Sequence, residues 1–346
     1  MGGLMAYSGL TTKIRAMESN FITDAQFREI AELSSVPQVV GYLKKNRGYA
    51  EVLSELDENN MHRGEIESLL RYEALLDYTS LYRFSNQEQR KFLKLYSKRY
   101  EIRVLKRCLS SIFDHRDISG DLGKLQKYYD KNTSLDVEKL STSTTLEEFV
   151  GNLKGTDYYD GMKLMVKTDN PTLYDYEVAL DLYYFSYIWK QKDKILSGKD
   201  LDLITNAYGS KFDMLNLWWI HRAKRYFHMS SPDIYAMLIP VRYKLRKEQI
   251  SALVESETPE EFASQLSQTY YSRVYDNITP ETLEDMYVYV LKHVLLKESQ
   301  QNPYSVATIY SYLYQKEHEI NRLVIALECI RYGLEADETM GYILKT

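Results

Sequence analysis

The sequence predicts an all-α protein, and three observations support this fold class. Only 7 prolines and 15 glycines occur in 346 residues, which favours long uninterrupted helices over a β protein with many turns. Long stretches rich in apolar and aromatic residues, including many of the 32 tyrosines, have the length of helices rather than strands. Two helical patterns also recur three times each, and such a repeat decides the architecture.

The first recurring pattern is a short helix, a turn and a second helix, at residues 29–49, 139–159 and 252–271. Three sets of apolar residues align: Ile30 with Leu140 and Leu253, Val39 with Phe149 and Phe262, and Leu43 with Leu153 and Leu266. Ser, Thr or Pro residues form the turn. Acidic residues then open the second helix, as capping and the helix dipole favour: Glu147, Glu148, Glu260 and Glu261.

The second recurring pattern is a tyrosine followed five residues later by an acid. The segments "YSKRYEIRVL" (96–105), "YGSKFDMLNL" (208–217) and "YQKEHEINRL" (314–323) align without gaps. Their acids are Glu101, Asp213 and Glu319, and a leucine follows each acid four residues later. The longer stretch 208–227 reads as a helix that is mostly buried.

The spacing of both patterns predicts three domains. Copies of each pattern lie roughly 110 residues apart, and a unit of this size can hold its own hydrophobic core. We therefore expect similar helical domains of about 110 residues at 1–118, 119–232 and 233–346. Three such bodies can stack in a row or close around a centre, and the repeat does not choose between these arrangements.

The three repeated acids allow a catalytic or a structural interpretation. Glu101, Asp213 and Glu319 could converge in one site for acid–base chemistry. Their recurrence at one place in every copy favours a structural role, because duplication reproduces structure. Burial of each acid would require donors, either tyrosine hydroxyls or N–H groups at a helix start. On that basis Asp213→Ala is expected to cost about 1 to 3 kcal/mol.

The sequence contains no recognisable catalytic, cofactor or metal motif. It lacks GxxxxGK[ST], GxGxxG and GxSxG. The "HEINR" segment has Arg322 where a zincin needs its second histidine. The six histidines form no pair at ligand spacing, and His221 and His228 read as solvated. Cys108 and Cys329 are expected to be buried apolar thiols. We therefore expect no catalytic residue, no cofactor and no metal.

Charge and hydropathy limit the partners and the compartment. A net charge of -5 argues against a nucleic-acid binder that neutralises phosphates. No window approaches the roughly 18 apolar residues of a membrane-spanning helix, and the N-terminal stretch lacks the apolar run of a signal peptide. Two distant cysteines fit a reducing compartment. These features predict a cytoplasmic protein without direct membrane insertion.

Basic stretches at 99–107, 221–225 and 242–247 are either solvated helix faces or contacts for an acidic partner surface. The candidate partner-contact residues are Arg222, Lys224, Arg225, Arg242, Lys244 and Arg246. Acidic residues in "TTLEEF" and "ESETPEEF" indicate a surface of alternating sign, which orients docking more than it sets affinity.

Three segments resemble the C subunit family of bacterial and archaeal V/A-type rotary ATPases, which is similar to subunit d of the eukaryotic V-ATPase. They are "YSGLTTKIRAMESNFITDAQFREI", "FDMLNLWWIHRAKRYF" and "NPYSVATIYSYLYQKEHEINRLVIALECIRYGL". The resemblance spans nearly the whole chain, and "KIRAMES", "FDMLNL" and "KEHEINRL" are its most specific pieces. In the last copy Asn321 precedes Arg322 instead of a leucine, which departs from the family's pattern.

The resemblance implies a funnel of three similar helical domains with pseudo-threefold symmetry. It implies a non-catalytic component of the central stalk, peripheral to the membrane, that joins the D and F subunits of the rotor shaft to the membrane proteolipid ring. Such a socket transmits torque for H+ or Na+ transport or for ATP synthesis.

Two classes outside this family are the alternatives. A general helical scaffold for soluble partners would share the composition and the repeat. An all-helical enzyme such as a terpenoid synthase would need paired metal-binding acids, as in DDxxD, which the sequence lacks.

Overall fold

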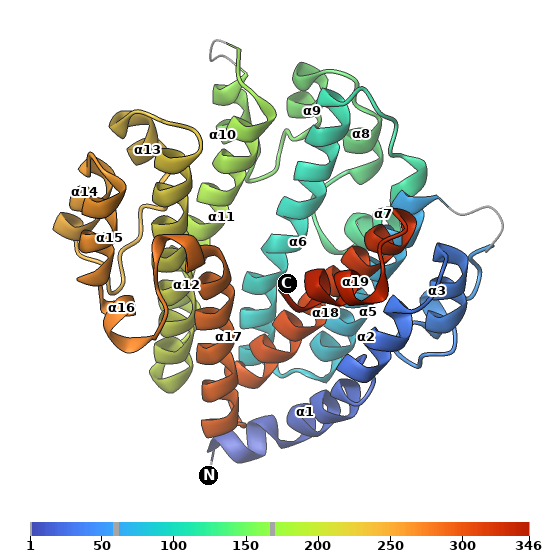
Figure 1. The fold of residues 1–346 in the computed structure, drawn as a ribbon. Helices are drawn as coiled ribbons and strands as arrows, with labels where there is room; N and C mark the ends of the chain where they lie inside the picture. The colour runs from blue at the N-terminus through green and yellow to red at the C-terminus, as the bar shows by residue number, and fades with distance from the viewer. Residues whose placement is uncertain (1, 58–61, 167–169, 346) are drawn as a thin grey trace. The chain divides into compact units, whose positions relative to one another are not determined.

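The computed structural model describes residues 2–57, 62–166 and 170–345. All regular secondary structure in these residues is helical, so the all-α class is confirmed (Figure 1). Six long helices follow one another in three pairs along the chain: α5 (Arg63–Phe84) and α6 (Gln87–Phe113), α11 (Leu173–Ile195) and α12 (Gly198–Arg225), and α17 (Leu283–Gln301) and α18 (Val306–Arg331). The tyrosine-and-acid pattern lies in the second helix of every pair.

Three groups of short helices carry the first recurring pattern. They are α2 (Asp24–Ala31), α3 (Val36–Leu43) and α4 (Ala50–Leu53); α8 (Val137–Thr142), α9 (Leu146–Asn152) and α10 (Tyr159–Met165); and α14 (Lys247–Glu255), α15 (Pro259–Ser267) and α16 (Tyr270–Val274). The hydroxyls of Thr145 and Thr258 cap α9 and α15, where they accept the N–H groups of Glu148 and Glu261. The predicted helix–turn–helix units are therefore confirmed.

The remaining helices connect these groups or lie at the chain ends. They are α1 (Gly2–Glu18), α7 (Gly123–Asn132), α13 (Ser231–Met237), α19 (Ala336–Lys345) and the 3-10 helices η1 (Gly120–Leu122) and η2 (Pro280–Thr282).

The predicted helix at 208–227 ends two residues early. Helix α12 stops at Arg225, because His228 adopts a left-handed conformation (φ 48°) and the N–H of Met229 turns back to the carbonyl of Ala223. Tyr226 and Phe227 consequently lie beyond the helix and are 65% and 62% exposed. Most of the preceding residues of the stretch are buried, as expected.

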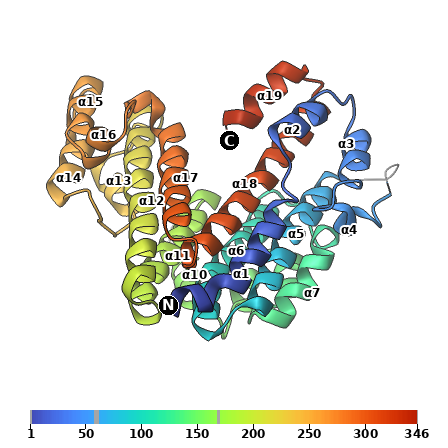
Figure 2. The same cartoon turned by 90° about the horizontal axis from the view of Figure 1, so that it is seen from below.

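The described residues form two compact units. Unit 1 contains those of Met1–Leu93, Ser97–Glu177 and Tyr312–Thr346, and unit 2 contains Lys94–Tyr96 and Val178–Ser311. In unit 2, α12 and α17 lie side by side over much of their length (Figure 1). In unit 1, α2 lies beside α19 (Figure 2). The division into domains at 1–118, 119–232 and 233–346 stays a prediction.

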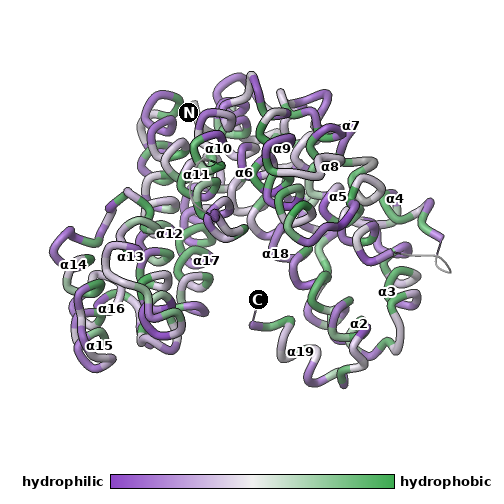
Figure 3. Tube along the Cα trace, turned by 90° about the horizontal axis from the view of Figure 1, so that it is seen from above, coloured by the Kyte–Doolittle hydropathy of each residue, from purple (hydrophilic) through white to green (hydrophobic). Residues whose placement is uncertain are grey.

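The two ends of the chain share one hydrophobic core within unit 1. Phe27 and Leu43, from the first short-helix group, belong to the same buried cluster as Leu323 of α18 and Ile343 of α19. Hydrophobic and hydrophilic residues alternate along these helices, as expected where one side is buried (Figure 3). The first short-helix group therefore packs against the last long helix, although nearly the whole chain separates them.

Candidate partner-binding surface and buried acid sites

Asp213 is fully buried and accepts four hydrogen bonds within unit 2. The backbone N–H groups of Tyr243, Lys244 and Leu245 donate to its carboxylate at 3.1, 2.6 and 3.1 Å, and the Tyr271 hydroxyl donates at 2.9 Å. Burial raises the pKa of Asp213, and the four donors oppose this rise. The carboxylate thus fixes the segment that leads into α14.

Glu319 holds the first short-helix group against α18 within unit 1. Its carboxylate accepts the backbone N–H of Ile22 at 2.6 Å and the Tyr49 hydroxyl at 2.5 Å. The Lys316 ammonium lies 3.5 Å away. Burial raises the pKa of Glu319, against the attraction of Lys316 and the donated hydrogen bonds. This residue therefore joins segments that lie 297 positions apart.

Glu101 makes the corresponding contact with the second short-helix group. The Tyr158 hydroxyl donates to it at 2.8 Å and the Lys98 ammonium at 3.2 Å. Glu101 is 7% exposed.

Each of the three acids therefore accepts a tyrosine hydroxyl from a short-helix group. Glu101 and Asp213 bind the group that follows them in the chain, and Glu319 binds the first group. Tyr158 and Tyr271 each stand eighteen residues after an aligned leucine of the first pattern, and Tyr49 stands one place later. These tyrosines are not among the site residues predicted from the sequence, although they recur at the end of each copy of the first pattern. Because donors occupy each carboxylate, this arrangement fits fastening rather than acid–base chemistry.

Gly209 gives a test of the packing beside Asp213. A Cβ at this position in α12 would overlap the Tyr243 ring. Gly209→Ala should therefore destabilise the protein by about 1 to 3 kcal/mol in chemical unfolding. Helix propensity alone predicts the opposite sign, a gain of roughly 0.5 to 1 kcal/mol. Gly151→Ala, where the added Cβ meets nothing within 4 Å, is the control.

A buried charge cluster surrounds Lys316 in unit 1. Lys316 is 2% exposed, its ammonium lies 3.6 Å from Asp77, and it sits over the Tyr49 ring at 4.3 Å. Tyr312 donates to Asp77 at 2.6 Å. Burial raises the pKa of the nearby Glu73 to about 7; Lys316 opposes this rise, and Asp77 adds to it.

Glu73→Gln should therefore change stability in a pH-dependent way. The folded-state pKa of Glu73, about 7, lies above its ordinary value of 4.5, so its contribution to stability is present at low pH and is lost as pH rises through 7. We expect the variant to be about 2 kcal/mol more stable than the parent at pH 8 and nearly equal at pH 4.5. Urea unfolding at both pH values measures this; equal differences would contradict it.

The six candidate partner-contact residues all lie in unit 2, in different environments. The exposed members are Arg222, Arg225, Arg242, Lys244 and Arg246. Lys224 differs, because its ammonium donates to the carbonyl of Val254 at 2.5 Å and thus supports the end of α14. The Lys244 ammonium lies over the rings of Tyr243 and Tyr270, at 4.6 and 5.5 Å.

A mixed-charge groove of 770 Å³ lies beside the end of α12. Lys224 and Arg225 line it together with Glu257, Glu260 and Glu281. The expected alternation of charge thus occurs within one groove. His221 was expected to be solvated, but it is half-buried against Phe262, 5.5 Å between rings, and burial lowers its pKa.

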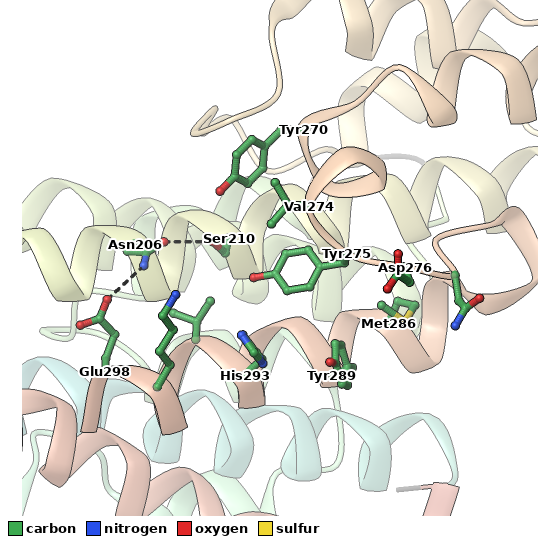
Figure 4. Close-up of a pocket in the computed structure, with 13 residues that line it drawn as sticks. Asn206, Ser210, Tyr270, Val274, Tyr275, Asp276, Met286, Tyr289, His293 and Glu298 are labelled. Carbon is green, nitrogen blue, oxygen red and sulfur yellow. Dashed lines mark hydrogen bonds between the residues drawn. The ribbon is translucent and has the colours of Figure 1, made fainter. Parts of the chain in front are cut away.

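An aromatic groove of 710 Å³ lies between α12, α16 and α17 (Figure 4). Tyr275 packs against Tyr289 and His293, with ring centroids 6.2 and 5.8 Å apart. At one end the Asn206 amide donates to Glu298 at 3.5 Å. Tyr289 is 51% exposed. Aromatic side chains with polar tips are enriched where proteins bind other proteins.

The remaining expectations concern the cysteines, metal-binding groups and membrane-spanning helices, and they are compared with the described residues. Cys108 and Cys329 are buried free thiols, as predicted. Across residues 2–57, 62–166 and 170–345, no group of three or more His, Cys, Asp or Glu side chains could hold a metal ion. Over the same residues, no helix combines the length and hydrophobicity that a membrane crossing requires.

These features define a helical repeat protein whose grooves suit protein contact. The chain belongs to the ATP synthase (C/AC39) subunit family, whose profile matches residues 10–342. It is 24% identical to the C subunit of the A-type ATP synthase from Methanocaldococcus jannaschii, over 99% of this chain and 87% of that protein. The corresponding proteins of Thermococcus kodakarensis and Pyrococcus abyssi are 25% and 26% identical, over 97% and 96% of this chain and 90% and 88% of theirs. The family resemblance is thus confirmed.

Proposed function

We propose that this protein is a non-catalytic component of the central stalk of a V/A-type ATP synthase. In this role it is a socket that joins the D and F subunits of the rotor shaft to the membrane proteolipid ring and transmits torque for H+ or Na+ transport. The observation that carries the proposal is family membership over residues 10–342. A three-domain, pseudo-threefold arrangement is part of the same proposal, and the threefold sequence repeat supports it.

A protein that transmits torque must resist deformation, and the buried acids provide resistance of this kind. Each one fastens a short-helix group to a long helix through buried hydrogen bonds, as Asp213 does with four donors. Opening such a contact would leave several buried polar groups without partners, at roughly 1 to 3 kcal/mol each. The fold therefore has stiff connections at the three places where the repeat puts an acid.

The exposed cations of unit 2 are the proposed partner contacts. Arg222 and Arg225 lie at the end of α12, close to the exposed rings of Tyr226 and Phe227. The Arg222 guanidinium lies 5.8 Å from the Phe227 ring. Arginine beside exposed aromatic rings is a combination enriched at interfaces. Lys224 is a weaker candidate than the sequence indicated, because its ammonium already binds Val254.

Charge reversal tests this surface. The double variant Arg222→Glu/Arg225→Glu should weaken binding to a purified D–F complex by about tenfold at low salt and reduce its salt dependence. Lys190→Glu/Lys292→Glu, at two exposed positions of the same unit, is the control and should change affinity less than about twofold. Biolayer interferometry with immobilised D–F measures both.

The binding partners distinguish this proposal from the alternative, a general helical scaffold for soluble proteins. A pull-down with purified D–F and with detergent-solubilised proteolipid ring should recover the chain with both. Recovery with neither would reject the stalk role and leave the scaffold alternative.

A further inference from the structure

Among the residues that the structure describes, six cationic side chains line one cavity of 640 Å³ in unit 1. They are Arg63, Arg71, Arg103, Lys106, Arg107 and Arg116. Among the described lining residues, two carboxylates accompany them, those of Glu67 and Glu177. Cations therefore outnumber carboxylates among the described residues that line the cavity.

Two facing rows of helix positions produce this concentration of charge. Arg63, Glu67 and Arg71 are spaced four residues apart and share one face of α5, and Arg103 and Arg107 share one face of α6. Arg107 joins the two helices, because its guanidinium donates to the Ser68 hydroxyl at 2.7 Å and to the Gly64 carbonyl at 3.4 Å. Contacts between α5 and α7 place α7 beside the same cavity (Figure 2).

Carboxylates contact most of these arginines, since Arg63 lies 2.7 Å from Glu328 and Arg116 lies 3.7 Å from Asp114. Glu317 receives both Arg99, at 2.5 Å, and Arg103, at 2.9 Å, so one carboxylate serves two cations. Arg71 directs two nitrogens at a single oxygen of Glu67, at 3.0 and 2.8 Å.

The pKa values of Arg71 and Glu67 respond to the neighbouring cations, whereas for Arg103 burial alone would lower the pKa but Glu317 raises it. Burial and repulsion from Arg103 lower the pKa of Arg71 despite its contact with Glu67. Burial alone would raise the pKa of Glu67, but Arg71, Arg107 and Arg63 bring it below its ordinary value. Arg71 and Arg103 are only 21% and 33% exposed, so solvent screens their charges less than it would on an open surface.

We propose that this cavity binds a small molecule with adjacent phosphate groups, held by Arg71, Arg103 and Arg107. Guanidinium groups match phosphate oxygens in geometry and bind them in pairs. The volume lies within the range of small-molecule sites, roughly 300 to 1,000 Å³. Inorganic polyphosphate and a nucleoside triphosphate share this chemistry, and the experiment distinguishes them.

Isothermal titration of the full chain at constant ionic strength tests the site with three probes: sodium tripolyphosphate, ATP without added metal, and sulfate. Tripolyphosphate should bind at least about tenfold more tightly than sulfate. Tighter binding of ATP than of tripolyphosphate identifies a nucleotide as the ligand, and equal binding identifies the phosphate chain alone. Sulfate binding as tightly as tripolyphosphate would overturn the proposal, as would no binding of either polyphosphate.

Three variants assign the binding to the cavity. Arg71→Gln should weaken tripolyphosphate binding by about tenfold or more. Arg116→Gln removes a cation at an exposed lining position, so it should fold normally and weaken binding by about threefold. Arg28→Gln, which removes a partly exposed arginine paired with Asp337 outside the cavity, is the matched control and should change binding less than about twofold.

Equal losses in Arg116→Gln and Arg28→Gln would show a response to net charge alone and would reject the site even if Arg71→Gln fails to fold. Binding to D–F and the proteolipid ring is measured separately, so this result does not depend on the proposed function.

Discussion

Asp213→Ala should lower the free energy of unfolding of unit 2 by about 3 to 5 kcal/mol. The substitution leaves three backbone N–H groups and the Tyr271 hydroxyl without their common acceptor in a fully buried place. The expected loss exceeds the range inferred from sequence alone, because four donors depend on this one carboxylate. The segment 243–245 should also lose its fixed path into α14.

The three tryptophans make the measurement specific. Trp189, Trp218 and Trp219 all lie in unit 2, so intrinsic tryptophan fluorescence follows the unfolding of that unit, while far-UV circular dichroism follows the helices of both units. Asp213→Ala should move the fluorescence transition to lower urea. Asp213→Asn retains one acceptor oxygen and should lose less, about 1 to 3 kcal/mol. Equal losses in the two variants would show that the hydrogen bonds do not cause the effect.

The helical repeat was predictable because its signals are local. Apolar spacing, capping residues such as Thr145 and Thr258, and the scarcity of proline and glycine act over one or two helical turns. The termination of α12 at Arg225 was missed, because a histidine takes the left-handed position where a glycine would have marked the end. The sequence also predicts that the repeated acids need hydrogen-bond donors if they are buried. It does not predict which residues donate.

Long-range contacts account for what the sequence did not predict. No local pattern indicates that Ile22 and Tyr49 bind Glu319, since the chain must close on itself to bring them together. The arginine-lined cavity was missed for a similar reason. Arg103 and Arg107 lie in the basic stretch at 99–107, but Arg71 comes from another helix, and only packing combines them. Side-chain direction likewise decides that Lys224 binds Val254, which charge alone cannot indicate.

Glu319→Ala should produce the second large loss, about 2 to 4 kcal/mol, and this loss should be confined to unit 1. The carboxylate accepts the Ile22 N–H and the Tyr49 hydroxyl and attracts Lys316. Removing it leaves the buried Lys316 ammonium with Asp77 as its remaining ion-pair partner among the residues that the structure describes. The first short-helix group should then separate from α18 more readily. Hydrogen exchange should therefore increase in α2 and in the residues before it, which that carboxylate holds in place.

Alanine substitution at each of the three repeated acids distinguishes the loss of specific contacts from a general effect of lost charge. Glu101→Ala removes one tyrosine contact and one lysine contact, so its cost should be the smallest, about 1 to 2 kcal/mol. Glu319→Ala and Glu101→Ala should shift the circular dichroism transition and leave tryptophan fluorescence unchanged, whereas Asp213→Ala should shift the fluorescence. An identical loss at all three positions would contradict this ranking, because each substitution removes one negative charge but a different set of contacts: four hydrogen bonds for Asp213, two hydrogen bonds and the Lys316 ion pair for Glu319, and two hydrogen bonds for Glu101. The ranking therefore reflects the contacts that each acid makes, because the charge of the acid is the same at all three positions.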